Sequence, residues 1–146
     1  MNQSQSKSPG KKTTNKAVAK VEIPYKPRPY QLSVHNSLKR FSVLVCHRRF
    51  GKSVLAINEL IKTAADKPRS LCAFIAPTYR QGKSIAWEYL KQYTAPLMKY
   101  GGGRNETELR IDLFNNSRIQ IFGADNPDSI RGMGFDKVVM DEYAIM

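Results

Sequence analysis

The chain has 146 residues, of which 41% are hydrophobic and 25% are charged, so it is long and apolar enough for one globular domain with a buried core. No segment approaches the roughly 18 consecutive apolar residues that a membrane-spanning helix needs. The first twenty residues also lack the apolar run of a secretory signal. These observations disfavour membrane and secreted classes, and they predict a cytoplasmic protein without a membrane partner.

The net charge of +12 is concentrated in the first third of the chain, where residues 1–52 hold twelve Lys and Arg against one acid, Glu22. Ser, Asn, Gln, Thr and Lys dominate residues 1–20, and this composition predicts a disordered basic tail. Such a tail either contacts nucleic acid or an acidic partner, or is a solvated arm, and charge alone does not decide between them. Cys46 and Cys72 lack the paired spacing of a zinc site and are expected to be reduced thiols.

Three short apolar runs have the β-rich composition of buried strands, at residues 41–46, 71–75 and 137–140. A short helix is expected before the first run, around residues 31–39. The spacing of apolar residues predicts a second helix that ends at about Ala65. A third helix is predicted after the second run, with an apolar face made of Ala86, Tyr89, Leu90 and Tyr93.

Three consecutive glycines, residues 101–103, predict a loose connection. Residues 109–113 and 118–121 then alternate between apolar and polar side chains on either side of a turn, which predicts a β-hairpin. We expect this hairpin to be an insertion or an edge of the sheet. Alternation of apolar strands with helices predicts an α/β fold with a mostly parallel sheet covered by helices on both faces.

The segment HRRFGKS lies between the first apolar run and the second predicted helix. In a phosphate-binding loop at this place, backbone N–H groups face a phosphate at the helix N-terminus. Lys52 would reach the β- and γ-phosphates, and the Ser53 hydroxyl would hold Mg²⁺. The usual motif has a glycine six residues before the lysine, where this chain has Cys46. The alternative is that Gly51-Lys52-Ser53 is an ordinary helix start with a capping serine.

The third apolar run ends in an acidic pair, Asp141-Glu142. An acidic residue at the end of a buried strand opposite a phosphate loop is the form that a Mg²⁺ site takes. Asp141 would hold the ion, and Glu142 would accept the proton of the attacking water. A strand that ends in a polar loop is the alternative. With the phosphate loop, the pair predicts a P-loop NTPase fold that uses ATP and Mg²⁺, with a sheet incomplete at its C-terminal end.

Two other segments carry candidate site residues. The Gln31 amide can both donate to and accept from an adenine edge, and Tyr30 could stack on the base; alternatively, Tyr30 packs against protein and Gln31 caps a helix. Arg131 lies in the glycine-rich segment RGMG, either as a finger that stabilises phosphate charge or as a solvated arginine.

Together, these segments resemble the ATPase domain of phage terminase large subunits, in the order RPYQ, CHRRFGKS, APTYRQ, SIRG and VVMDE. The resemblance covers most of residues 24–143, and an arginine-rich phosphate loop without its first glycine is common in that family. It implies that residues 21–146 are the N-terminal part of an ATPase domain. It also implies an ATP-driven motor that moves viral double-stranded DNA into a capsid through a portal protein.

The same resemblance implies a homo-oligomeric ring in the full-length protein, a terminase small subunit as partner, and the cytoplasm of an infected bacterium as location. Gln31 would recognise adenine, and Arg131 would act on the ATP of a neighbouring subunit. Arg48 would sense or stabilise the γ-phosphate. The nucleotide would be surrounded by the loop residues His47, Arg48, Arg49, Phe50, Gly51, Lys52 and Ser53, with His47 shaping the loop.

Two other functions stay open at this point. A helicase-like DNA-dependent ATPase shares the adenine glutamine, the phosphate loop and the acidic pair. However, its loop starts with glycine and its acidic pair continues as Asp-Glu-x-His or Asp-Glu-x-Asp, whereas residues 141–144 here read DEYA. A non-catalytic fragment that binds DNA or a capsid would leave Glu142 without a role. The nuclease domain of the terminase family, and the motif that couples hydrolysis to movement, lie beyond the residues that the resemblance covers.

Overall fold

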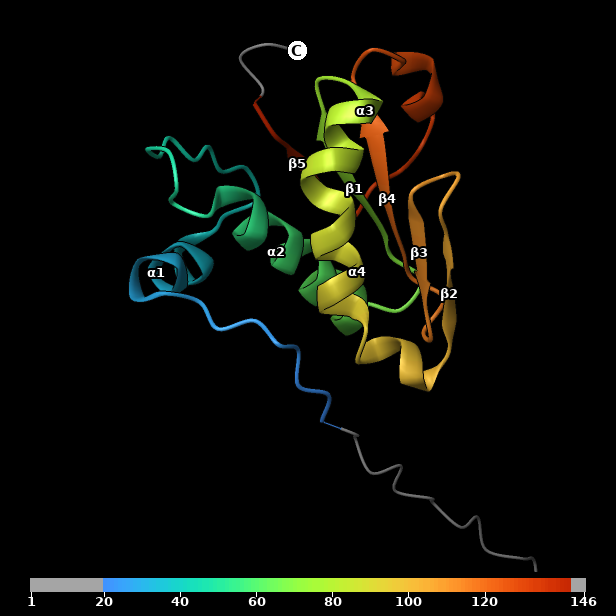
Figure 1. The fold of residues 1–146 in the computed structure, drawn as a ribbon, viewed down its shortest axis with the longest axis horizontal. Coiled ribbons are helices and arrows are strands. Elements are labelled where there is room, and N and C mark those ends of the chain that lie inside the picture. The colour runs from blue at the N-terminus through green and yellow to red at the C-terminus, as the bar shows by residue number, and fades with distance from the viewer. Residues whose placement is uncertain (1–19, 143–146) are drawn as a thin grey trace, which may run out of the picture.

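The computed structural model describes residues 20–142 and contains a five-stranded sheet with the strand order β2-β3-β4-β1-β5 (Figure 1). The strands are β1 (Leu71–Ala76), β2 (Gly102–Asn105), β3 (Arg110–Leu113), β4 (Arg118–Gly123) and β5 (Lys137–Met140). β4, β1 and β5 run parallel, and β2, β3 and β4 pair antiparallel. The α/β class is therefore confirmed, but the sheet is mixed where a mostly parallel one was predicted.

The helical segments are α1 (Pro29–Ser37), α2 (Lys52–Asp66), α3 (Tyr79–Gly82), α4 (Glu88–Thr94), the π-helical turn η1 (Lys83–Trp87), and the 3-10 turns η2 (Leu97–Tyr100) and η3 (Pro127–Ile130). α3, η1 and α4 form one continuous helical segment, which lies with α2 over one face of the sheet (Figure 1). None of the helices in residues 20–142 is both long and apolar enough to cross a membrane.

The main core lies between that helical layer and the sheet. Its fully buried side chains come from both layers and include Ile57, Ile61, Phe74, Trp87, Leu90, Ile111, Ile119 and Ile121. The opposite face of the sheet carries a smaller apolar cluster, in which Ile130 and Phe135 cover Ala73, Ile75 and Phe122. Thus the described chain covers one face with helices and the other face mainly with η3 and the loop that follows it, rather than both faces with long helices as predicted.

The predicted strand at residues 41–46 is wrong for this structure. The segment has no strand hydrogen bonding, and the side chains of residues 41–45 are solvent-exposed, with Phe41 84%, Val43 90% and Val45 93% exposed. A β-strand forms only against a neighbour that accepts its backbone hydrogen bonds. β5 pairs only with β1, and no strand among residues 20–142 lies next to this apolar segment. The segment therefore forms no strand, despite its β-rich composition.

The predicted hairpin is confirmed as the antiparallel pair β3–β4, with Asn116 at φ 63° in its turn. It is neither an insertion nor an edge, because β4 lies between β3 and β1 in the middle of the sheet. The glycine segment predicted as a loose connection also joins the sheet, as β2. At φ 110°, Gly102 approaches β3 so closely that a Cβ would lie 2.2 Å from the Asp112 carbonyl oxygen, so this strand start requires glycine.

Candidate functional site

The predicted phosphate loop is a turn at residues 48–50 that leads directly into α2. Gly51 is the N-cap of α2 and has φ 85°, a conformation that glycine adopts without steric cost. Its carbonyl accepts the first helical hydrogen bond, from Leu55 N at 3.0 Å. The free N–H groups of the first turn of α2 therefore face the space in front of the loop, which is the arrangement that binds anions at a helix N-terminus.

A pocket of about 420 Å³ lies in front of this helix N-terminus. One wall is the loop and the first turn of α2, and the other wall comes from η1 and α4. The lining residues are Arg49, Phe50, Gly51, Lys52, Ser53 and Val54, with Ser84, Ile85 and Tyr89 opposite. The last three were not predicted as site residues, since no motif marks them. The Lys52 ammonium group donates to the Cys46 carbonyl at 3.4 Å, so it lies back over the loop.

The acidic pair lies beside the same helix. Asp141 follows β5, and its backbone N–H donates to the Ile75 carbonyl of β1 at 2.9 Å. The Ser53 hydroxyl donates to the Asp141 carboxylate at 3.3 Å, although the two residues are 88 positions apart in the chain. The structure therefore brings together the two oxygen-bearing side chains that the sequence predicted as metal ligands.

These two side chains fit a magnesium site. Mg²⁺ prefers oxygen ligands, and in nucleotide sites it is held by one or two protein groups together with phosphates and waters. Among residues 20–142, no cluster of three or more His, Cys, Asp and Glu side chains offers a more complete metal cage. Glu142, next to Asp141, is exposed and has φ 53°, an unusual backbone conformation for a non-glycine residue.

Gln31 and Tyr30 lie at the back of the loop. The Gln31 side chain is only 4% exposed, and its Oε1 accepts from Arg28 N at 2.9 Å, which caps α1. Its Nε2 donates to the carbonyls of Phe50 at 3.4 Å and Gly51 at 3.3 Å. The Tyr30 ring packs on the Phe50 ring, with centroids 4.8 Å apart. The amide thus ties α1 to the phosphate loop, and its groups already have partners within the protein.

These bonds lead to a prediction for Gln31→Ala. We expect the variant to bind ATP and GTP analogues about tenfold more weakly, and equally so, because the loss of hydrogen bonds to the loop loosens the phosphate site rather than a base-reading contact. Binding should be measured by fluorescence titration in the full-length protein, with Asn36→Ala, an exposed polar residue of the same helix, as the control. A loss confined to ATP would instead establish adenine recognition by this amide.

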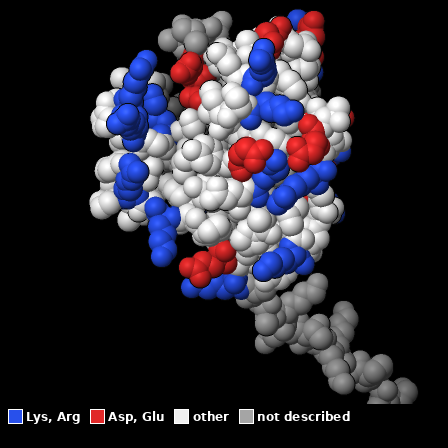
Figure 2. Space-filling view, viewed as in Figure 1, with Lys and Arg blue, Asp and Glu red and all other residues white. Residues whose placement is uncertain are grey.

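The predicted arginines lie apart from the pocket lining. Arg131 follows η3, its side chain is 81% exposed, and it pairs with Asp128 at 3.3 Å. Arg48 is exposed on the loop turn, and its carbonyl contacts the His47 ring. Exposed basic side chains also gather over α1 and the following loop (Figure 2); they are Arg28, Lys39, Arg40, Arg48 and Arg49.

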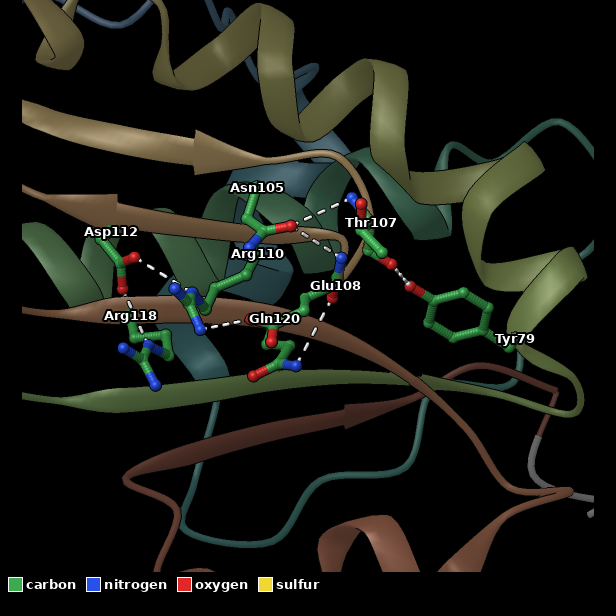
Figure 3. A network of polar contacts seen from close by, with 8 residues as sticks. All are labelled: Tyr79, Asn105, Thr107, Glu108, Arg110, Asp112, Arg118 and Gln120. Carbon is green, nitrogen blue, oxygen red and sulfur yellow. Dashed lines mark hydrogen bonds and ion pairs between the residues drawn. The ribbon is translucent and has the colours of Figure 1, made fainter.

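A larger hollow, of about 630 Å³, lies elsewhere, on the sheet face that α2 does not cover. Three of its four charged lining residues are paired: Arg118 and Arg110 both bond Asp112, and Arg110 also bonds Glu108 (Figure 3). The Tyr79 hydroxyl donates to the Thr107 carbonyl at 2.7 Å at one end of this network. Because these charges satisfy one another across two strands, the hollow offers little free charge for a ligand.

The fold and the site define the class of the protein. It is an α/β domain in which the N-terminus of a helix lies beside the acidic end of a strand. The family model for the N-terminal part of the terminase large subunit, T4likevirus-type, matches residues 45–146. The chain therefore belongs to this terminase family. It is 27% identical over 139 residues to the terminase large subunits of Thermus phage G20c and Thermus virus P23-45, in an alignment that covers 84% of this chain.

Solved structures agree with this assignment. The large terminase ATPase domain of Thermus phage P74-26 superposes with a TM-score of 0.74 at 26% identity, over 84% of this chain and 56% of that one. A point variant of the same domain gives a TM-score of 0.75. The chain spans 29% of the length of the curated terminase large subunits that it matches.

Proposed function

We propose that this chain carries the ATP- and Mg²⁺-binding part of a motor that moves viral double-stranded DNA into a capsid. The observation that supports this most strongly is the 3.3 Å contact between Asp141 and Ser53, which lines the pocket at the N-terminus of α2. An exposed base, Glu142, follows directly. A helix N-terminus, a lysine, a hydroxyl and a carboxylate at one place are the groups that phosphoryl transfer from ATP needs.

Each side chain has a distinct proposed role. Lys52 moves from the Cys46 carbonyl to the β- and γ-phosphates, which offer it stronger, charge-assisted hydrogen bonds. Ser53 and Asp141 would hold Mg²⁺, which would supply positive charge beside the phosphate oxygens. Glu142 takes the proton of the attacking water. Arg48 senses the γ-phosphate, and Arg49 and Phe50 line the pocket near it.

The partners proposed for the full-length protein are those of a packaging motor: double-stranded DNA, a portal protein, a terminase small subunit and further copies of the same chain in a ring, all in the cytoplasm of an infected bacterium. The basic surface over α1 and the following loop (Figure 2) can contribute salt-dependent contacts to DNA phosphates. The predicted basic tail at residues 1–20 falls almost wholly outside the described residues. A helicase-like ATPase is not favoured, since the family match is to a terminase.

The test of the ATP site is Lys52→Ala in the full-length protein. We expect affinity for a fluorescent ATP analogue to fall about 10- to 100-fold, because the variant loses a charge-assisted hydrogen bond to phosphate. The thermal unfolding midpoint should stay close to the parental value, because Lys52 is only partly buried and packs outside the core. Lys62→Ala, on the exposed side of the same helix, is the matched control. Parental affinity in Lys52→Ala would show that the loop does not bind phosphate.

A further inference from the structure

A buried ionic cluster, separate from the pocket, joins the three elements that carry the proposed site. Its centre is Glu59, in the middle of α2, which is only 6% exposed. One carboxylate oxygen of Glu59 pairs with His35 of α1, and the other pairs with Lys137 of β5. The other ring nitrogen of His35 hydrogen-bonds the Tyr25 hydroxyl at 2.9 Å. None of these four side chains lines the pocket.

Separating Glu59 from His35 and Lys137 is costly, because the Glu59 carboxylate is a desolvated charge. Burial alone would raise the pKa of Glu59, but the hydrogen bonds from Lys137 and His35 outweigh burial and hold that pKa below its usual value. The carboxylate is therefore ionised near neutral pH. Moving α2 away from β5 would take Lys137 from this carboxylate, and breaking a pair this desolvated is more costly than breaking an exposed pair.

The Glu59–Lys137 pair connects the same two elements that carry Ser53 and Asp141. Besides the exposed Lys67–Asp136 pair at their far ends, α2 and the β5 segment are linked at two places, by Ser53 to Asp141 and by Glu59 to Lys137. The two links are six residues apart on the helix, or about 9 Å at the helical rise. They are four residues apart on the strand, or about 13 Å. A helix held only at one end can pivot, whereas a second, buried link along its length sets both its direction and its rotation relative to the strand.

From this geometry we propose that Glu59 is a positioning residue for the magnesium site. By binding Lys137, it holds α2 against β5 and keeps the Ser53 hydroxyl near the Asp141 carboxylate, where both would serve as Mg²⁺ ligands. By binding His35, it also holds α1, which carries the Gln31 amide behind the phosphate loop. This inference rests on the proposed function, since it assigns a role in a site that binds Mg²⁺ and ATP.

The test measures metal dependence rather than turnover. In the full-length protein, affinity for a fluorescent ATP analogue is titrated against Mg²⁺ and is measured separately in EDTA. For Lys137→Met, we expect the Mg²⁺ concentration at half-maximal enhancement to rise about tenfold, as for other residues that orient metal ligands. Affinity in EDTA should change by less than about twofold, because the loop itself is untouched. Glu59→Gln retains the shape and one acceptor of the carboxylate, so it should show a smaller shift in the same direction.

Two further variants distinguish failure of the proposed function from failure of the positioning role of Glu59. Lys67→Met removes an ion pair with Asp136 that joins the far ends of the same two elements, but the Lys67 side chain is 63% exposed, so its Mg²⁺ dependence should match the parent. Ser53→Ala should lose most of the Mg²⁺ enhancement. If the parent itself shows no Mg²⁺ enhancement, the proposed function fails, and this inference fails with it.

If the parent and Ser53→Ala behave as expected but Lys137→Met and Glu59→Gln keep parental Mg²⁺ dependence, only the positioning role of Glu59 is overturned. An equal loss of affinity with and without Mg²⁺ would also overturn it, because that pattern reports a general loss of structure. Should Lys137→Met fail to fold, Glu59→Gln decides alone by the same criterion.

Discussion

Glu142→Gln in the full-length protein should bind ATP with parental affinity and lose about 10²- to 10⁴-fold in kcat, the range for removal of a general base. Glu142 is exposed beside Asp141, so an amide of the same shape disturbs no packing. The amide cannot accept a proton from water, whereas the carboxylate can. The residue also has φ 53°, two positions beyond the end of β5, and strained backbone conformations of this kind cluster at active sites.

The measurement combines steady-state ATP hydrolysis with direct binding of an ATP analogue. Glu88→Gln is the control, since Glu88 is also an exposed carboxylate, 79% exposed on α4, and has only a surface pair with Lys91. A Glu142→Gln protein that hydrolyses ATP at the parental rate would assign the base to another group. Weaker binding without a change in kcat would place Glu142 in nucleotide binding instead of catalysis.

Apolar spacing and composition were enough to predict one long helix and two of the strands. The helix predicted to end at about Ala65 is α2, which ends at Asp66, and the strands at residues 71–75 and 137–140 are β1 and β5. Residues 41–46 have an equally apolar composition but no neighbouring strand in the described chain. Strand formation depends on pairing between distant segments, so composition alone could not reveal the difference.

The sequence likewise predicted some features of the candidate site and missed others. The motifs assigned Ser53 and Asp141 to one Mg²⁺ site, and the two side chains lie 3.3 Å apart, although residues 41–46 before the loop form no strand. Nothing in the sequence indicated that the Gln31 amide would bond the carbonyls of Phe50 and Gly51. Tyr89 was assigned to an apolar helix face by regular spacing, yet it is 40% exposed and lines the pocket. The π-helical turn η1 precedes it and changes the helical phase, which regular spacing does not anticipate.

Arg131→Ala should lower the rate of ATP hydrolysis in the assembled full-length protein by about 10³- to 10⁵-fold, the effect of removing an arginine finger. We predict that Arg131 acts on the ATP of a neighbouring subunit and not on that of its own subunit. The Arg131 side chain is 81% exposed, lies outside the lining of the pocket in front of α2, and has Asp128 as its ion-pair partner among residues 20–142. Gly132, at φ 78°, follows it directly, so the loop turns sharply at this arginine.

The decisive experiment mixes two variants, each of which is expected to be inactive alone. Arg131→Ala subunits retain Glu142, and Glu142→Gln subunits retain Arg131, so a mixed ring contains contacts where an intact arginine faces an intact site. Partial ATPase activity should therefore return, with a maximum at an intermediate mixing ratio. Asp128→Ala is the control, because it removes the surface partner of Arg131 but keeps the guanidinium, and it should retain near-parental turnover. If Arg131→Ala alone turns over at the parental rate, or if no mixing ratio restores activity, Arg131 does not act between subunits. Restoration would also require that the subunits assemble with Arg131 at the interface, where its exposed side chain faces the pocket of a second copy.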